Sequence, residues 1–298
     1  MSSHLPPETV AAVIRFQNLT KTFRRARILD DVNLQVRLGE RVALIGSNGA
    51  GKTTLIRCLL GEYVHDGLVE IDGRNPRQQR TEVLGMIGFV PQLPPPLKMP
   101  VGQLIDFSAA LCGTAPQRIH DIADRLGLDL SGILARPFVK LSGGMKQKLL
   151  IAIALGREAK VLVMDEPAAN LDPQARKIFF ELLAERASNA TMLISSHRIN
   201  EVSSLVNRVV ELDMGKVVLD ESVSEDVELT GMLRAKVSSK RAEPALNKAL
   251  GLWNFQSLNA DLTEWEGMVA GPDRLRFLGM VSRYVSVVNH VSMTEVEP

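Results

Sequence analysis

Cysteine is scarce in this sequence, which has only two, Cys58 and Cys112, among 298 residues. Neither lies in a CxxC pair or in a cluster of cysteines and histidines, so the sequence argues against a disulfide framework and against a zinc site. Two isolated thiols fit a protein of the reducing cytosol.

Long apolar runs and an excess of one charge are also lacking. No run of about 18 apolar residues occurs, so no segment is predicted to span a bilayer. Residues 1–16 lack the basic stretch followed by an apolar core that is typical of a secretion signal. The 35 basic and 34 acidic residues give a net charge of +1, so no broad positive surface is available for nucleic acid or an anionic membrane. A role at a membrane would require docking onto a partner that is inserted there.

The composition is otherwise that of an ordinary globular protein, with 45% apolar and 23% charged residues. The length suffices for a domain of about 200 residues with a smaller one attached. Changes of texture along the chain predict a flexible tail over residues 1–12, a main domain over 13–221, and a small α+β domain over 222–298.

Short apolar runs alternate with amphipathic helical patterns through the main domain. The runs predict strands over 13–19, 28–36, 41–47, 67–73, 86–90, 160–164, 191–195, 208–213 and 216–221. The helical patterns predict helices over 53–61, 101–113, 119–128, 173–187 and directly after Gly144, while the polar stretch 73–80 predicts a solvated loop. Buried strands alternating with helices are typical of an α/β fold, a largely parallel sheet with helices on both faces, and the helical stretch 100–157 predicts a subdomain of its own.

The last 70 or so residues have a different pattern. Strands are expected over 233–239, around 253–259, over 264–270 and over 290–297, with helices over 243–251 and 273–285. This βαββαβ order is ferredoxin-like. Trp253, Phe255 and Trp265 either line a ligand pocket there or pack a small core or a dimer contact.

A complete phosphate-binding motif, GxxxxGK[ST], spans Gly46–Thr53 between a predicted strand and a predicted helix. Its glycines let successive backbone N–H groups face the β- and γ-phosphates of a nucleotide, and Lys52 adds a positive charge. The Thr53 hydroxyl is placed to ligate Mg²⁺. The expected nucleotide-binding residues of this loop are Gly46, Ser47, Asn48, Gly49, Ala50, Gly51, Lys52, Thr53 and Thr54.

Two acidic residues, Asp165 and Glu166, follow the apolar strand VLVM. Asp165 at the strand end can hold Mg²⁺, directly or through water. Glu166 can polarise a water molecule for in-line attack on the γ-phosphate. Together with the phosphate loop, the pair predicts a nucleotide triphosphatase.

A second feature, LSGGMKQK at 141–148, also resembles a phosphate site but is incomplete. Its two glycines open a helix, where bare N–H groups attract negative charge. In place of the loop lysine it offers only the Ser142 hydroxyl beside Gly143 and Gly144. The chain therefore has one complete phosphate feature and one partial one.

With the phosphate loop, GFVPQ, LSGGMKQK, MDEP, ANLD and ISSH in this order, residues 13–221 resemble the ATP-binding subunits of ABC transporters. The resemblance implies a P-loop NTPase fold with an antiparallel β subdomain and a helical signature subdomain. It also implies a dimer in which Ser142, Gly143 and Gly144 contact the γ-phosphate of ATP held by the other subunit. The partial motif and the complete motif would then belong to one shared site.

The same resemblance implies roles for single residues. Phe23 would stack on adenine, Gln92 would touch Mg²⁺ and the attacking water, and His197 would contact the γ-phosphate. Asp172, in ANLD, would reach the opposite subunit. Gln92 would also lie beside the contact with the membrane subunits.

Two departures from the family pattern stand out. Met145 occupies the fifth position of a signature that is commonly LSGGQ, a variant similar to that of exporters with separately encoded membrane subunits. The segment Leu93–Pro96, LPPP, stiffens the loop after Gln92, and it either presents a fixed apolar surface to the membrane partner or has no consequence.

These features predict an ATPase motor that uses ATP and Mg²⁺ and drives integral membrane permease subunits from the cytoplasmic face of the inner (plasma) membrane. A homodimer is expected, and export is favoured over import. The rival is a soluble ATPase acting on nucleic acid or the ribosome. Against it, the chain has one phosphate loop, no zinc cysteines and no space for a long coiled coil between the loop and the signature. A membrane complex serving periplasmic metalloenzyme assembly stays open as a cargo role.

Overall fold

The structure, a computed structural model, describes residues 12–157, 159–187, 190–197, 202, 205–222, 232–282, 284 and 286–295. Nearly all of the predicted tail, and the charged stretch before residue 232, lie outside these residues. Within the described part, no helix is long and apolar enough to cross a membrane.

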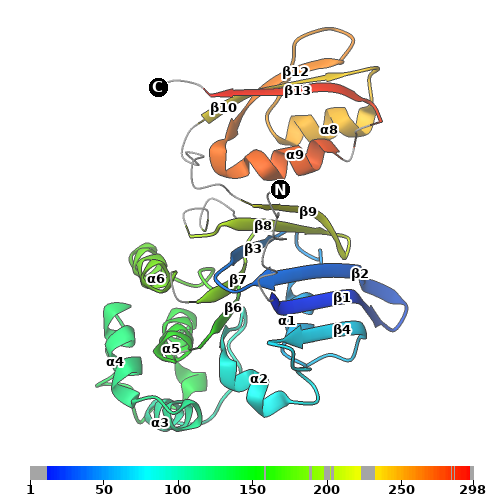
Figure 1. The fold of residues 1–298 in the computed structure, drawn as a ribbon. Coiled ribbons are helices and arrows are strands. Elements are labelled where there is room, and N and C mark those ends of the chain that lie inside the picture. The colour runs from blue at the N-terminus through cyan, green and yellow to red at the C-terminus, as the bar shows by residue number, and fades with distance from the viewer. Residues whose placement is uncertain are drawn as a thin grey trace, which may run out of the picture.

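A six-stranded sheet forms the centre of the molecule (Figure 1). Its order is β5 (Ile87–Val90), β6 (Val161–Asp165), β7 (Thr191–Ser195), β3 (Arg41–Ile45), β8 (Arg208–Asp213) and β9 (Lys216–Ser222). All neighbours pair in parallel except β8 and β9, which form an antiparallel hairpin. The central strands are almost continuously apolar because both faces of the sheet are covered. The predicted α/β class and its parallel sheet are confirmed.

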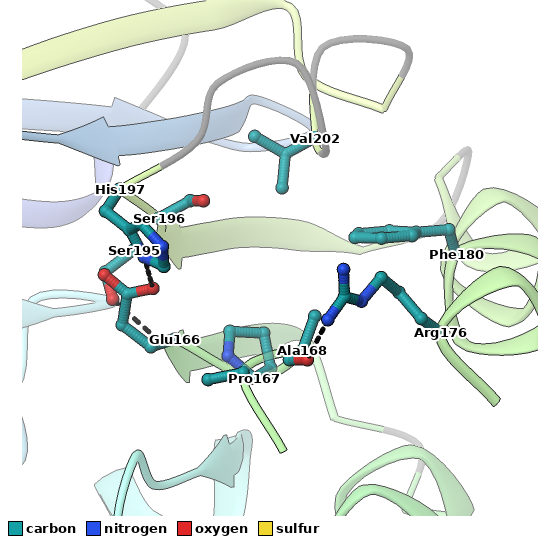
Figure 2. A pocket seen from close by; sticks show the side chains of 10 residues that line it. Glu166, Pro167, Ala168, Arg176, Phe180, Ser195, Ser196, His197 and Val202 are labelled. Carbon is teal, nitrogen blue, oxygen red and sulfur yellow. Dashed lines mark hydrogen bonds and ion pairs between the residues drawn. The ribbon is translucent and has the colours of Figure 1, made fainter. Parts of the chain in front are cut away.

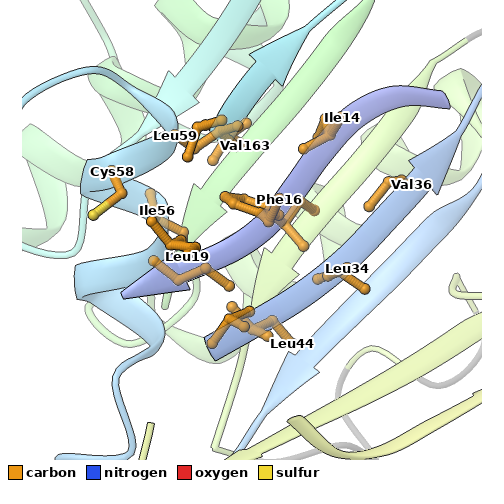
Figure 3. Close-up of a cluster of buried hydrophobic side chains, with 14 of the residues drawn as sticks. Ile14, Phe16, Leu19, Leu34, Val36, Leu44, Ile56, Cys58, Leu59 and Val163 are labelled. Atoms are coloured by element: carbon orange, nitrogen blue, oxygen red, sulfur yellow. The ribbon is translucent and has the colours of Figure 1, made fainter. Parts of the chain in front are cut away.

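A three-stranded antiparallel sheet covers one side, in the order β2 (Ala26–Arg37), β1 (Ala12–Phe23) and β4 (Asp66–Ile71). Figure 3 shows Ile14, Phe16 and Leu19 of β1 packed with Ile56 and Leu59 of helix α1 (Lys52–Leu59). Cys58 belongs to the same cluster, and burial raises the pKa of its thiol to about 11. The apolar packing therefore holds the antiparallel sheet against the helix that follows the phosphate loop.

Helices gather at the other end of the sheet, around a separate apolar cluster (Figure 1). They are α3 (Val101–Cys112), α4 (Pro116–Arg125) and α5 (Gly143–Gly156), with the short turn η1 (Phe138–Lys140) before α5. Helix α6 (Pro173–Arg186) follows β6 and packs beside β7. The helices predicted in this part of the chain are present.

Among the described residues, helix α2 (Arg80–Met86) was not predicted. It directly precedes β5, and its first residue ends the stretch 73–80 that was predicted as a solvated loop. It has only seven residues and buries only Val83, so its periodicity is too short to read. Arg80 anchors its start by donating to the Leu60 carbonyl oxygen at 3.1 Å.

The C-terminal part forms a four-stranded antiparallel sheet in the order β11 (Gln256–Ser257), β12 (Glu264–Ala270), β10 (Met232–Ser239) and β13 (Val288–Glu295). Helices α8 (Pro244–Leu252) and α9 (Arg274–Ser282) complete the predicted βαββαβ order, with η2 (Gly271–Asp273) before α9. Trp253, Phe255 and Trp265 belong to its apolar core, and the rings of Phe255 and Phe277 stack at 4.8 Å. Of the alternatives for these aromatics, core packing is the one that the structure shows.

Helix α9 faces the hairpin β8–β9, so the C-terminal sheet sits over one edge of the central sheet (Figure 1). At Gly279 a Cβ would lie 2.8 Å from Glu211 Oε2 and 3.9 Å from Leu219 Cβ. The absence of a side chain at Gly279 thus permits the close approach of α9 to both strands.

Candidate functional site

The loop Gly46–Gly51 connects the central strand β3 to helix α1. Gly46, Gly49 and Gly51 have φ values of +146°, +87° and +111°, a region that residues with a Cβ rarely adopt. A Cβ on Gly46 would also overlap the carbonyl oxygen of Leu212 in β8. The sequence of the loop and the strand next to it therefore fix its path together.

The turn between β8 and β9 braces this loop from one side. The Gly215 N–H donates to the Ala50 carbonyl oxygen at 3.0 Å, and the Asp30 N–H donates to the Gly215 carbonyl oxygen at 2.9 Å. Gly215 has φ +78° and Met214 φ +46°, so the turn is left-handed at both residues. The hairpin turn links the phosphate loop to β2.

Lys52, the first residue of α1, is 7% exposed and lies inside this arrangement. Its Nζ donates to the carbonyl oxygens of Gly46 (2.7 Å) and Ser47 (3.3 Å) and lies 4.0 Å from Glu166 Oε1. Burial lowers the pKa of the Lys52 ammonium, while the negative charges of Glu166 and Asp165 act to raise it. The lysine is thus folded back over its own loop, with an acidic partner opposite.

An open cavity of about 480 Å³ lies over the loop. Its lining residues are Phe23, Ile28, Ser47, Asn48, Gly49, Ala50, Gly51, Lys52, Thr53, Thr54, Gln92 and Glu166. The Phe23 ring is 39% exposed and is held edge-to-face by Tyr63 at 5.0 Å, with Lys21 Nζ 4.4 Å from its centroid. The phosphate loop, an aromatic face, Gln92 and Glu166 therefore meet in one cavity.

The carboxyl ends of β6 and β7 bring Asp165, Glu166, Ser195 and His197 together beside this cavity. Figure 2 shows Glu166, Ser195 and His197 of this group. Ser195 Oγ donates to Asp165 Oδ1 at 2.7 Å and accepts from the Glu166 N–H at 2.9 Å. His197 Nδ1 lies 2.7 Å from Glu166 Oε2. Glu166 itself has φ +48°, an uncommon conformation that is typical of constrained sites.

A second, smaller cavity of about 130 Å³ is lined by Glu166, His197 and Arg176, among others (Figure 2). Arg176 Nη2 donates to the Ala168 carbonyl oxygen at 3.4 Å. Phe180 and Val202 close the cavity on its apolar side. Glu166 lines both cavities.

The oxygen donors here fit Mg²⁺. Thr53 and Gln92 line the large cavity, and the buried Asp165 directly precedes Glu166. Hydroxyl, amide and carboxylate oxygens are the ligands that Mg²⁺ takes alongside nucleotide phosphates. Among the described residues, no three or more His, Cys, Asp and Glu side chains are grouped to hold a metal ion. The residues thus suit a metal held partly by a bound nucleotide.

The signature residues lie elsewhere. Ser142 is the N-cap of α5, and its Oγ accepts from the Met145 N–H at 3.2 Å. Ser142, Gly143 and Gly144 are not among the residues that line the large cavity. A Cβ at Gly144 would contact the Asn170 carbonyl oxygen at 3.3 Å, whereas a Cβ at Gly143 would project into open space. The partial phosphate motif and the complete one therefore do not share a cavity within one chain.

Helix α5 is tied to the segment after Glu166. Gln147, fully buried, donates from Nε2 to the Pro167 carbonyl oxygen at 2.9 Å, and Lys148 Nζ lies 2.9 Å from Asp172 Oδ2. Asp172 is also the N-cap of α6, where it accepts from the Ala175 N–H at 2.9 Å. The hydrogen bond from the Ala175 N–H, followed in importance by the one from Lys148, holds the pKa of Asp172 below its usual value. The signature helix and the Asp172 segment thus form one connected unit.

Sequence reasoning missed three residues of the site: Ser195, Gly215 and Tyr63. Ser195 ends a strand of five buried residues, and its neighbour Asp165 ends the adjacent parallel strand. Serine at the carboxyl end of a buried strand was the available signal, because ligands in open α/β sheets bind at that edge. Gly215 and Tyr63 act through contacts with segments distant in the sequence, and no local pattern indicates them.

A family model described as "ABC transporter" matches residues 29–169. The phosphonates import ATP-binding protein PhnC 1 of Natronomonas pharaonis is 34% identical over 223 residues, which cover 70% of this chain and 93% of that protein. The lantibiotic transport ATP-binding protein SrtF of Streptococcus pyogenes is 32% identical over 221 residues, which cover 72% of this chain and 94% of that protein.

Solved structures are similar over the same share of the chain. One is a dimer of an ATP-binding cassette in a post-hydrolysis state, bound to ADP and Pi. It matches with a TM-score of 0.64 at 22% identity and covers 71% of this chain and 99% of that chain. At this identity the likeness concerns the fold.

Proposed function

The chain belongs to the ATP-binding subunits of ABC transporters and is an ATPase, and from this premise we propose that ATP-driven closure of its dimer moves a separate membrane permease. The observation that carries the proposal is the division of the two phosphate motifs. The complete motif lines the large cavity, and the start of α5 does not. A second subunit would supply the missing part.

Within one site, the backbone N–H groups of the phosphate loop and Lys52 bind the β- and γ-phosphates of ATP. Glu166 takes a proton from water as the water oxygen attacks the γ-phosphorus and the bond to ADP breaks. His197, 2.7 Å from Glu166, orients that carboxylate and contacts the γ-phosphate. Mg²⁺, when held by Thr53, Asp165 and Gln92, would neutralise phosphate charge. Phe23 offers its exposed face to the adenine, and stacking on a ring does not select one base.

Across the dimer, Ser142, Gly143 and Gly144 of one subunit contact the γ-phosphate bound by the other. The open surroundings of Gly143 support this role, because backbone N–H groups need close approach. Asp172, joined to the same helix through Lys148, reaches the opposite subunit. A homodimer is proposed because each chain carries one complete and one partial phosphate motif. ATP then favours the closed state because it binds there to two surfaces at once.

The permease docks beside Gln92. Leu93, directly after it, is 74% exposed, and Phe107 and Leu111 on one face of α3 are 55% and 70% exposed. Exposed apolar side chains after Gln92 and along α3 support a contact surface for a membrane partner. A Leu93→Cys variant should crosslink to an integral membrane protein in host membranes, whereas Val64→Cys, 61% exposed in the loop before β4, should not. Equal crosslinking at both positions would contradict this docking site.

We propose export, with the chain held at the cytoplasmic face of the membrane. The LSGGM variant and the short C-terminal domain over 222–298, proposed here as a regulatory or dimerisation unit, support this direction. The named relatives include an import and a transport protein, so they do not favour one direction. Neither the nucleic-acid rival nor the metalloenzyme cargo finds support among these relatives.

The outward face of the C-terminal sheet is mainly polar and charged. This face, away from the core, carries Arg234, Lys236, Glu264 and Glu266 in the alternate positions of β10 and β12. Sheets that bind single-stranded RNA stack bases on aromatic residues; β10 and β12 hold none at these positions, and His290 of β13, which pairs with Ser238, adds one exposed ring to this face. Lys236 lies opposite Glu266, with its Nζ 3.5 Å from the Glu266 carboxylate.

Glu166→Gln tests the mechanism. This variant should bind ATP with the affinity of the native chain, hydrolyse it about 10²–10³ times more slowly, and elute as a dimer in ATP. Light scattering and phosphate release measure both properties. A monomer at saturating ATP would contradict the shared site, and unchanged hydrolysis would contradict the role of Glu166.

A further inference from the structure

Ser195 lies at the end of β7, directly across from Asp165 at the end of β6 in the parallel register. Its side chain is fully buried. Neither the P-loop nor the signature includes it. It is nevertheless the side chain that touches both acidic residues of the site.

One hydroxyl makes two different hydrogen bonds here. Ser195 Oγ donates its single hydrogen to Asp165 Oδ1 at 2.7 Å, so its lone pairs are left to accept the Glu166 N–H at 2.9 Å. The first bond fixes the rotamer of Asp165 and leaves Oδ2 as the oxygen for a metal. The second bond fixes the backbone of Glu166.

The backbone of Glu166 needs such support because its φ of +48° is unfavourable for a residue with a Cβ. In this conformation the Glu166 carboxylate lies between two groups, with Lys52 Nζ at 4.0 Å and His197 Nδ1 at 2.7 Å. A more ordinary φ would turn the carboxylate away from both.

We propose that Ser195 is a positioning residue for ATP hydrolysis, which sets the metal-binding oxygen of Asp165 and the direction of Glu166 with a single hydroxyl. The role assigned to it rests on the proposed function of this site. Residues that hydrogen-bond to metal ligands typically change metal affinity or activity by about 10–100-fold when they are removed. Nucleotide contacts made by the phosphate loop do not pass through Ser195.

The test compares full-length variants. Ser195→Ala removes the hydroxyl, Ser195→Cys keeps the volume with a poor hydrogen-bonding group, and Ser195→Thr keeps the hydroxyl. Thr191→Val is the matched control, because Thr191 is equally buried at the other end of β7 and its hydroxyl accepts the Gly39 N–H at 3.0 Å. The control thus loses a buried hydroxyl of the same strand away from the site.

Mg²⁺ binding is titrated by calorimetry on protein saturated with a non-hydrolysable ATP analogue, and kcat and KM are measured with ATP. Ser195→Ala and Ser195→Cys should need about tenfold more Mg²⁺ for half saturation and lose about 10–100-fold in kcat. Their KM for ATP should change by less than about threefold. Ser195→Thr should recover most of both losses, and Thr191→Val should match the native chain.

Several outcomes would overturn the role of Ser195. One is native Mg²⁺ affinity and native kcat in folded Ser195→Ala or Ser195→Cys. The others are an equal loss of Mg²⁺ affinity and kcat in Thr191→Val, and no recovery of these two quantities in Ser195→Thr. Thermal denaturation identifies any variant that does not fold. If either Ser195→Ala or Ser195→Cys fails to fold, the Mg²⁺ binding and kcat of the other variant decide the test. A native chain that hydrolyses no ATP in Mg²⁺ would instead contradict the proposed function.

Discussion

Replacing Gly215 with alanine tests whether the β8–β9 turn supports the phosphate loop. A Cβ at this position would overlap the Ile28 carbonyl oxygen and lie 2.9 Å from the Ile28 carbonyl carbon and 3.0 Å from Leu29 Cα. All three are backbone atoms of β2, so no side chain can move aside. The turn or the strand must shift.

The cost has two parts that a control can separate. Alanine at a φ of +78° costs about 1–2 kcal/mol in conformation, and forced overpacking adds about 1–3 kcal/mol. Gly39 has the same φ of +78° but nothing within 4 Å of its Cβ position. Gly39→Ala should therefore carry only the conformational cost, and the difference between the two variants measures the steric part.

Urea denaturation gives the free energies of unfolding, and titration with a fluorescent ATP analogue gives nucleotide affinity. If the turn shifts away from β2, the 3.0 Å bond from Gly215 N to Ala50 O is lost and the loop loses its brace. We expect Gly215→Ala to bind ATP about tenfold more weakly, which corresponds to about 1.4 kcal/mol, while Gly39→Ala binds normally. Equal destabilisation in both variants, or native ATP affinity in folded Gly215→Ala, would refute the reasoning.

Three other predictions concern the dimer, the pH response and the C-terminal sheet. Ser142→Arg and Lys52→Ala subunits should each be inactive alone, and their mixture should regain ATPase activity because each mixed dimer keeps one intact site; a mixture no more active than its parts would contradict independent shared sites. Because the pKa of Asp172 is lowered on folding, its hydrogen bonds stabilise the protein above the unfolded pKa of about 3.9 and are lost as pH falls through the lower folded pKa. Urea midpoints of the native chain and Asp172→Asn should therefore converge below about pH 4, and a gap that persists there would contradict the assignment. Gly267→Ala would push a Cβ into the buried Phe255 ring and should lower the free energy of unfolding by about 1–3 kcal/mol, with ATP affinity unchanged. Urea unfolding followed by the fluorescence of Trp253 and Trp265 measures this change, and an unshifted urea midpoint would count against this packing.

Much of the fold could be predicted because its signals are local. Apolar runs such as VLVM identify buried strands, and the βαββαβ order of the last part follows from the same periodicity. The phosphate loop could also be predicted, because the spacing of its own glycines indicates the conformation that it needs. Phe23, Gln92 and Glu166, expected at the nucleotide, line one cavity with it.

What could not be predicted depends on which segments become neighbours. Ser195 acquires its role only because β6 and β7 pair with Asp165 opposite Ser195. Gly215 acquires its role only because the hairpin turn lies between Ala50 and Asp30. Helix α2 is a local element, but one buried residue in seven gives too weak a pattern.

The brace of the phosphate loop also has a consequence for how the chain is made. β3 is flanked by β7 and β8, and the loop residues Gly46 and Ala50 contact Leu212 and Gly215. These two strands and the hairpin turn are synthesised long after the loop. At about 5–20 residues per second, a ribosome needs on the order of ten seconds to translate from the phosphate loop to the β8–β9 turn. Through that interval the nascent chain carries every residue of the nucleotide motif but not the strands that shape it. We therefore expect ATP binding to begin only when the β8–β9 hairpin has emerged from the ribosome.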